Sequence, residues 1–434
     1  MNYSTEVKQK LLSIITKMDS YYWLFTKHPK TDFSRKKKWS FEEVMKFMLT
    51  MEGKALRDEL LEYFEFDNTT PSNSSFNQQI LPEAFEFLFQ EFTKSFTDNV
   101  TYNGLRLIAC DGSDLCIAHN PQDETTYFQT LPDRKGYNLL HLNAFYDLCS
   151  RQYTDAIIQP SRLANERRAM CEMIDRYNDT SAIFIADRGY ENYNIFAHVE
   201  HKGMYYLIRV KDITSNGITS KLTMLPESGE FDEWVNVTLT KKQTNEVKAN
   251  PKKYRVIDKK TPFDYLDLHF NNFYEMKMRV IRFPIPQGSY ECIITNLPQD
   301  KFNSDEIKRL YAKRWGIETS FRELKYALGL TRFHSKKPEY IMQEIWSRMT
   351  LYNFCEIIAT NVVINEKKGC KHTYQLNYTR AIRICCYFLS IKKEKAPPDV
   401  EYLIGHELLP IRPGRTDPRK VKPQSAISFL YRAA

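Results

Sequence analysis

Polar residues in the stretch 311–325 have types and spacings that could do chemistry together. They are Tyr311, Arg314, Glu318 and Lys325, with Arg322 close by. An α-helix turns by about 100° per residue, so the first four would share a wedge roughly 60° wide beside an apolar stripe. A carboxylate there can bind a metal ion, and flanking Arg and Lys side chains can bind phosphate. The alternative is a solvated helix face held by intrahelical ion pairs.

Two aspartates are associated with runs that predict buried β-strands. Asp111 comes at or near the end of the run 105–111, and Asp187 directly follows the run 182–186. Ligands of open α/β sheets bind at strand ends, and carboxylate oxygens are ligands that Mg²⁺ prefers. The sequence therefore predicts a magnesium site that uses both residues. Each also has an ordinary interpretation, Asp111 as a turn former before Gly112 and Asp187 as a helix-start residue.

The segment 101–210 is expected to form the α/β core that positions these aspartates. Apolar runs predict strands and amphipathic runs predict helices, in the order three strands, helix, strand, helix, strand. The strands are expected at 105–111, 139–146, 153–158, 182–186 and 204–210, and the helices at 162–177 and 191–201. Segment 301–338 is expected to return to this core and to carry Glu318.

The segment 211–300 has a different character. Its runs predict a β-rich insertion without a convincing helix. The expected strands are 234–240, 265–270, 274–283 and 290–295.

Both ends of the chain are predicted to be helical. In 1–100, a capping box at Ser40 to Glu43 opens one helix, and further amphipathic runs follow at 56–66, 74–81 and 82–96. Helix, turn and short helix are typical of a DNA-reading unit and equally of an ordinary helical hairpin. The basic run 35–38 is either a phosphate contact or a solvated turn.

The last segment, 339–434, predicts helices at 339–364 and 377–391. A tail rich in Pro and Arg follows them, for which phosphate contact and disorder are the two alternatives.

Positive charge is concentrated in the last third of the chain. The 434 residues carry a formal net charge of +8. Residues 301–434 hold 25 Lys and Arg against 13 Asp and Glu, a net of +12, so the remainder is slightly acidic. A basic excess around and after 311–325 favours a polyanionic partner such as nucleic acid.

Composition and missing motifs exclude several classes of protein. A hydrophobic content of 42% indicates a globular chain. The nine Cys form no CxxC pair, which predicts free thiols in a reducing cytosol, although Cys370 with His372 could ligate a metal. No phosphate-binding glycine loop, no dinucleotide fingerprint and no G-x-S-x-G is present. Neither a secretory signal nor an apolar run of ~20 residues occurs, so a cytoplasmic protein is expected.

The pattern Tyr311-x₂-Arg314-x₃-Glu318-x₆-Lys325 resembles the motif that defines one group of DDE-type bacterial insertion-sequence transposases, the insertion sequence 4 group. Asp111 in Ala-Cys-Asp-Gly-Ser and Asp187 in Ala-Asp-Arg-Gly-Tyr match the first two acidic motifs of these proteins. Thr295-Asn-Leu and the closing Arg412-Pro-Gly-Arg are also similar. One departure is Gln78-Gln79, which precede Ile80 where relatives often have a basic residue.

The resemblance implies a ribonuclease H-like core, with a helical N-terminal DNA-binding domain at 1–100, core segments at 101–210 and 301–338, the β-rich insertion at 211–300 and a helical, basic region at 339–434. It implies a nucleoid-associated DNA transposase that binds its transposon ends as a homodimer, cleaves DNA and joins 3′-OH ends to a target.

In such an enzyme Asp111, Asp187 and Glu318 are the catalytic residues and bind two Mg²⁺ ions, for which Mn²⁺ can substitute. Tyr311, Arg314, Lys325 and Arg322 are then expected to contact DNA. Trp234, in the insertion, is a candidate for stabilising a flipped base, and its alternative is an ordinary core tryptophan.

Three other functions stay open at this point. The chain could be a catalytically inactive descendant that only binds DNA, a ribonuclease H-fold nuclease that cuts without joining, or a helical scaffold without a DNA role.

Overall fold

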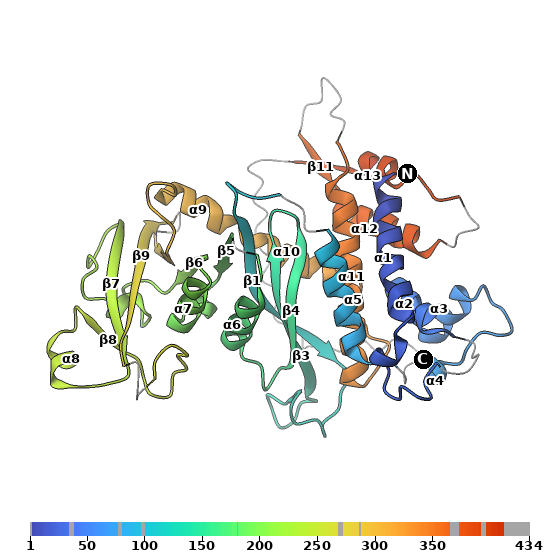
Figure 1. Cartoon of the computed structure of the whole chain (residues 1–434), viewed down its shortest axis with the longest axis horizontal. Coiled ribbons are helices and arrows are strands. Elements are labelled where there is room, and N and C mark those ends of the chain that lie inside the picture. Colours follow the sequence, from blue (N-terminus) through green and yellow to red (C-terminus); the bar gives the residue numbers. More distant parts are fainter. Residues whose placement is uncertain are drawn as a thin grey trace.

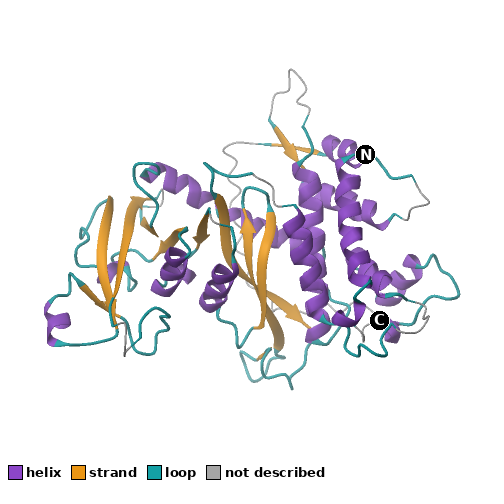
Figure 2. Cartoon of the chain, in the orientation of Figure 1, coloured by secondary structure: helices purple, strands orange, loops and turns teal. Residues whose placement is uncertain are grey.

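One large β-sheet runs through the computed structural model, and a bundle of helices packs at one end of it (Figure 1). The structure describes residues 2–33, 39–76, 80–96, 100–179, 181–267, 272–285, 288–364, 373–391 and 396–411. Helices and strands are both abundant, as Figure 2 shows. The predicted mixed α/β class is therefore confirmed.

The sheet has a parallel centre with antiparallel flanks. Its first strands are β1 (Arg106–Ile117), β2 (Tyr127–Phe128), β3 (Tyr137–Asp147), β4 (Gln152–Pro160), β5 (Ala182–Ala186) and β6 (Tyr205–Val210). The order is β2-β3-β1-β5-β6, and β4 pairs with β3. Strands β1, β5 and β6 run parallel, whereas β3 is antiparallel to β1. Helices α6 (Glu166–Arg176) and α7 (Tyr193–His201) make the connections, so the predicted order of elements is confirmed.

Side chains of β5 alternate between two hydrophobic clusters on opposite faces of the sheet. Phe184 belongs to the cluster that contains residues of α6 and α7. Ile183 and Ile185 belong to another cluster, with residues of α9 (Ser304–Lys313). All five residues of β5 are buried, because helices cover both faces. Since side chains alternate along a strand, Asp187 follows on the α9 face.

Strand β1 is longer than the sequence predicted. We expected it to end at or near Asp111, but it continues to Ile117. The reason is its second neighbour. The parallel pairing with β5 stops at Cys110, whereas the antiparallel pairing with β3 continues from Asp111 to Ile117. Asp111 therefore lies in mid-strand, at the point where one neighbouring strand ends.

The β-rich segment is hydrogen-bonded into the same sheet. Its strands are β7 (Phe231–Thr240), β8 (Tyr254–Val256), β9 (Tyr274–Pro284) and β10 (Tyr290–Thr295), and β10 pairs with β6. The fully buried Arg279 of β9 binds the Asp232 carboxylate of β7 and the Phe302 carbonyl just before α9. Through these two interactions Arg279 connects β7 and β9 to the loop that leads into α9.

Two predictions for this segment need correction. A strand was expected at 265–270, but Tyr265 lies in a turn, Leu266 belongs to no regular element, and 268–270 are outside the described residues. A short helix, α8 (Asn245–Ala249), occurs where none was expected. The Thr244 side chain caps it by accepting a hydrogen bond from the Val247 amide.

The N-terminal and C-terminal helices form one bundle around α11 (Figure 1). The bundle contains α1 (Tyr3–Asp19), α2 (Phe41–Thr50), α3 (Leu56–Tyr63), α5 (Pro82–Ser95), α11 (Pro338–Thr360), α12 (Tyr378–Ser390) and α13 (Val400–His406). Helix α11 touches α1, α2, α5 and α12 as well as β4, so almost its whole surface is buried. It forms where a helix was expected at 339–364, and it packs on the core through β4.

The N-terminal elements largely follow their sequence signals. The capping box of Ser40 and Glu43 is present at the start of α2. Of the short helix expected at 74–81, the structure has α4 (Asn73–Phe76), and Gln78 and Gln79 lie outside the described residues, as do 35–38. Strands β11 (Tyr374–Leu376) and β12 (Leu408–Pro410) form a separate small sheet.

A buried ion pair joins the sheet to the bundle. Arg151, which follows β3 at φ +58°, donates through Nε to Glu356 of α11 at 2.7 Å. Its guanidinium also lies 3.8 Å from the ring centroid of Tyr378 on α12. Burial raises the pKa of Glu356 to about 7, although the positive charge of Arg151 opposes the shift.

The remaining whole-chain predictions concern thiols and membranes. Each cysteine in the described part of the chain is a free thiol, as predicted, while Cys370 and His372 lie outside it. Within the described ranges, no helix is both long and apolar enough to span a membrane.

Candidate active site

Asp111 and Asp187 lie at neighbouring positions of adjacent parallel strands. Cys110 of β1 is the register partner of Ala186 of β5, and each aspartate is the next residue along its strand. The Asp187 side chain also accepts a hydrogen bond from the Arg188 amide and caps a single 3₁₀ turn. Asp187 is therefore a helix-start residue and also the residue that directly follows β5.

The stretch 311–325 is not one continuous helix, which corrects our prediction. Helix α9 ends at Lys313 and α10 (Trp315–Tyr326) begins two residues later, while Arg314 between them keeps helical backbone angles (φ −49°, ψ −34°). There the Arg314 amide donates to the Tyr311 carbonyl, and the Ile317 amide donates to the Arg314 carbonyl. Gly316 permits close packing of α10 on the sheet, since a Cβ there would lie 2.7 Å from Leu148. The shared wedge of polar residues assumes one uninterrupted α-helix, so it does not apply across Arg314.

Arg314 joins two of the three predicted catalytic carboxylates. Its Nη2 donates to Glu318 Oε1 at 2.7 Å, and its Nη1 lies 3.7 Å from Asp111 Oδ2. The residue is only 4% exposed, and its Nε is buried without a hydrogen-bond partner. Glu318 and Asp111 thus approach each other across a single buried guanidinium.

The third carboxylate is held by a different pair of residues. The Tyr311 hydroxyl donates to Asp187 Oδ1 at 3.3 Å, and Arg209 Nε of β6 lies 3.8 Å from the same oxygen. Burial raises the pKa of Tyr311 to about 12, with Arg314 and Arg209 opposing and Asp187 reinforcing the shift. The hydroxyl therefore stays protonated near neutral pH and remains a donor to Asp187.

Burial raises the pKa of Asp111 to about 6. The Gly112 amide and the positive charge of Arg314 act in the opposite direction, while the carboxylates of Glu318 and Glu166 raise it further. A cation bound nearby would oppose this shift, because it favours the charged form of the carboxyl group.

The donor chemistry fits a hard divalent cation, because carboxylate oxygens face one another across a space now bridged by a guanidinium. No group of three or more acidic, His or Cys side chains in the described ranges already has the spacing for one metal ion. Convergence of Asp111, Asp187 and Glu318 on a metal thus stays a prediction.

The residues predicted to contact DNA are placed differently from one another. Lys325 Nζ donates to the Asp114 carbonyl of β1 at 2.8 Å, and burial lowers its pKa. Arg322 is exposed on α10. Tyr311 and Arg314 contact the carboxylates, as described above.

Trp234 is not brought to the acidic residues. It lies on β7, and strands β6, β10 and β9 separate β7 from β5. Lys277 Nζ lies 4.9 Å from the centroid of its half-buried ring.

Two groups near Asp111 were missed by the sequence argument. His141 of β3 lies between Asp114, at 2.7 Å, and Glu166, at 3.0 Å. Burial lowers the pKa of His141, but the interactions with the Asp114 and Glu166 carboxylates outweigh this and raise it to about 9. Glu166 was hidden inside an expected helix at 162–177. The helix starts at Glu166 because Asn165 caps it, and that cap was the available signal.

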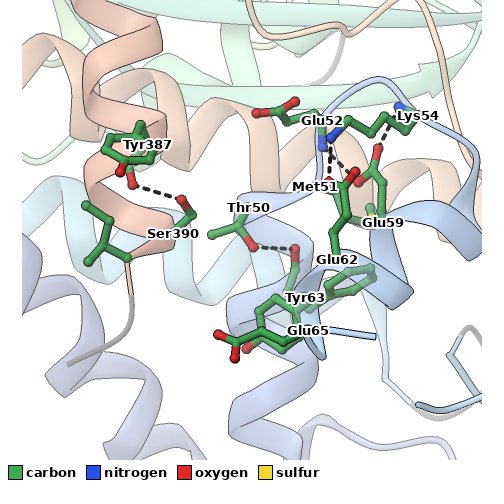
Figure 3. Close-up of a pocket in the computed structure, with 12 residues that line it drawn as sticks. Thr50, Met51, Glu52, Lys54, Glu59, Glu62, Tyr63, Glu65, Tyr387 and Ser390 are labelled. Atoms are coloured by element: carbon green, nitrogen blue, oxygen red, sulfur yellow. Dashed lines mark hydrogen bonds and ion pairs between the residues drawn. The ribbon is translucent and has the colours of Figure 1, made fainter. Parts of the chain in front are cut away.

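A pocket elsewhere on the protein does not suit a phosphodiester. It lies between α2, α3 and α12, and Figure 3 shows its lining side chains. The carboxylates of Glu52, Glu59, Glu62 and Glu65 are among them. Like charge disfavours DNA there.

Comparison with known proteins yields one family match and short alignments. The model of the family described as "Transposase DDE domain" matches residues 102–354. A 55-residue stretch is 40% identical to the transposase InsG for insertion sequence element IS4 of Escherichia coli strain K12, covering 12% of each chain. A 62-residue stretch is 29% identical to the transposase for insertion sequence element IS421 of Escherichia coli, covering 14% of this chain and 17% of the relative.

These alignments span less than a fifth of the length of either relative. Among solved structures, a cryo-EM structure of the piggyBac transposase synaptic complex with hairpin DNA aligns over 94% of this chain and 84% of that one. Its identity of 11% and TM-score of 0.45 are too low to bear on fold or function.

Proposed function

Because this chain belongs to the family of transposase DDE domains, as the resemblance predicted, we propose that it is a DNA transposase with a ribonuclease H-like core. It binds the ends of its insertion sequence, cleaves DNA and joins the 3′-OH ends to target DNA by a cut-and-paste route. The observation that supports this most directly is the meeting of Asp111 and Glu318 at Arg314, one strand away from Asp187.

In this proposal the catalytic residues are Asp111, Asp187 and Glu318, which hold two Mg²⁺ ions. Such ions, when bound, activate the attacking oxygen and stabilise the leaving oxygen of a phosphodiester. Arg314 aligns Glu318 with Asp111, and Tyr311 orients the Asp187 carboxylate through its hydroxyl. Tyr311 and Arg314, with Lys325 and Arg322, are also the residues proposed to contact DNA.

The partner in this proposal is double-stranded DNA, both the inverted repeats and the target, bound by a homodimer. The net charge of +12 in 301–434 supports contact with a polyanion. The helical segment 1–100 then serves as a DNA-binding domain beside the core segments 101–210 and 301–338, the β-rich insertion 211–300 and the helical, basic region 339–434.

The experiment that tests the proposal is a target-joining assay with a precleaved 3′-OH end. A transposase joins this end to target DNA in Mg²⁺, and chelation by EDTA abolishes joining. A ribonuclease H-fold nuclease instead nicks DNA without joining, and an inactive descendant binds the ends without either reaction. Either of these two results would overturn the assignment.

Lys325 provides a separate prediction about DNA binding. Lys325→Ala should weaken end binding and lower the slope of log affinity against log salt by about one, because one phosphate contact is lost. Filter binding of end DNA at several salt concentrations measures this slope. Lys308→Ala, which removes an ion pair with Asp305 on α9, is the control and should leave it unchanged. If Lys325 only ties α10 to Asp114, stability falls and the slope stays the same.

A further inference from the structure

The Glu166 carboxylate lies between the backbone segments that carry Asp111 and Asp187. A Cβ at Gly112, the residue after Asp111, would lie 2.7 Å from Glu166 Oε1. A Cβ at Gly189, two residues after Asp187, would lie 3.8 Å from Glu166 Oε2. At Gly112 a Cβ would also lie 2.5 Å from His141 Nε2, so only glycine fits beside His141 and Glu166, whereas the distance at Gly189 is an ordinary contact that places Glu166 near the turn after Asp187.

Neighbouring contacts fix the position of this carboxylate. Glu166 is the first residue of α6, whose Asn165 cap accepts from the Arg168 amide. The next residue, Arg167, donates through Nε to the Gly189 carbonyl at 2.9 Å. The N-terminus of α6 is thereby anchored to the turn that follows Asp187.

His141 of β3 forms an ion pair with one carboxylate oxygen of Glu166. It is only 8% exposed, and its Nε2 lies 3.0 Å from Glu166 Oε1 without the alignment of a full hydrogen bond. Its Nδ1 makes a shorter contact, 2.7 Å, with Asp114. The imidazole is therefore shared between two carboxylates and does not fully offset the charge of Glu166.

Glu166 and Glu318 approach Asp111 from opposite faces of the sheet. Helix α6 packs on one face with Cys110 of β1, and α10, which carries Glu318, packs on the other face with Ala109 of β1. Strand β5 stops at Ala186, so beyond that point the edge of β1 next to Asp111 has no parallel neighbour. Glu166 lies beside Gly112, the residue after Asp111, at this open edge.

We propose that Glu166 is a fourth carboxylate of the metal-binding centre, which strengthens the binding of a divalent cation at Asp111 from the α6 face. This inference rests on the proposed function, since it assumes that Asp111 binds a metal. Glu166 acts directly or through a water molecule, and Gly112 leaves room for its carboxylate beside β1. Its role is thus to position and retain the cation.

The test is Mn²⁺ binding to the full-length chain, measured by isothermal titration calorimetry without DNA. Glu166→Gln keeps the shape of the side chain and removes its charge, so the Mn²⁺ affinity should fall about 10- to 100-fold. The matched control is Glu172→Gln on the same helix, where an exposed ion pair with Arg168 is lost and the affinity should not change. Asp111→Asn is the reference variant that should lose binding altogether.

Each outcome decides between distinct claims. If Asp111→Asn loses Mn²⁺ and Glu166→Gln binds like the wild type, Glu166 only seats α6 and this inference is wrong, while the proposed function stands. If the wild-type chain binds no Mn²⁺, both claims fail. Should Glu166→Gln not fold, Glu166→Asp replaces it. It keeps the charge and shortens the reach by one methylene, so the same fall in affinity is expected.

Discussion

Replacing Glu318 by Gln should reduce strand cleavage by about 10³-fold or more while leaving the affinity for transposon ends nearly intact. The substitution removes a charge that can hold a metal ion and keeps the size of the side chain. Asp111→Asn and Asp187→Asn should have the same effect for the same reason. Nicking of end-labelled DNA measures cleavage, and an electrophoretic mobility shift measures binding.

A matched control for Glu318 exists on the preceding helix. Glu306 lies in the first turn of α9 and pairs with Arg309, so Glu306→Gln removes a carboxylate without touching the site. Cleavage by this variant should match the wild type. A Glu318→Gln variant that still cleaves at the wild-type rate would remove Glu318 from the catalytic residues.

The second large effect concerns stability. Arg151→Ala should lower the free energy of unfolding by about 3–5 kcal/mol, because it leaves the buried carboxylate of Glu356 without its cation. The double variant Arg151→Ala with Glu356→Gln should recover much of the loss. Urea denaturation measures both, and the exposed Arg168→Ala is the control, expected within about 0.5 kcal/mol of wild type.

The loss should also depend on pH. The pKa of Glu356 is already raised to about 7 in the folded protein, above its ordinary value of 4.5. A folded state with the higher pKa binds more protons than the unfolded state, so this group lowers stability as pH rises from about 4.5 through 7. Removing Arg151 raises the pKa further, so the deficit of the variant should be larger at pH 8 than at pH 6. An equal deficit at both values would contradict the assignment.

Local patterns in the sequence predicted most of the core. The run that forms β5 is short and wholly apolar, which is typical of a strand buried on both faces, and Asp187 follows it directly. The spacing from Tyr311 to Lys325 identified two residues that contact predicted catalytic carboxylates, since Tyr311 bonds Asp187 and Arg314 bonds Glu318. Signals of this kind depend on residues close together in the chain.

The errors arose where distant residues decide the outcome. Strand β1 continues past Asp111 because β3 pairs with it, and no local signal marks that partner. The helix break at Arg314 reflects contacts with Asp111 and Glu318 and the packing of Gly316 on Leu148. In the sequence Glu166 has the pattern of an ordinary acidic residue in the first turn of a helix. Only the fold brings it beside Gly112 and Gly189.

The continuous hydrogen bonding between β6 and β10 has a mechanical consequence. Four residue pairs join these strands, and Arg279 clamps β7 and β9 to the loop that leads into α9. The outer strands and the strands that carry the aspartates therefore belong to one continuous sheet, and the β6–β10 boundary is hydrogen-bonded like the rest of it. A displacement of β7 is expected to reach Asp187 along the hydrogen-bonded strands. It is also expected to reach α9 and α10, which carries Glu318, through the bond between Arg279 and the Phe302 carbonyl.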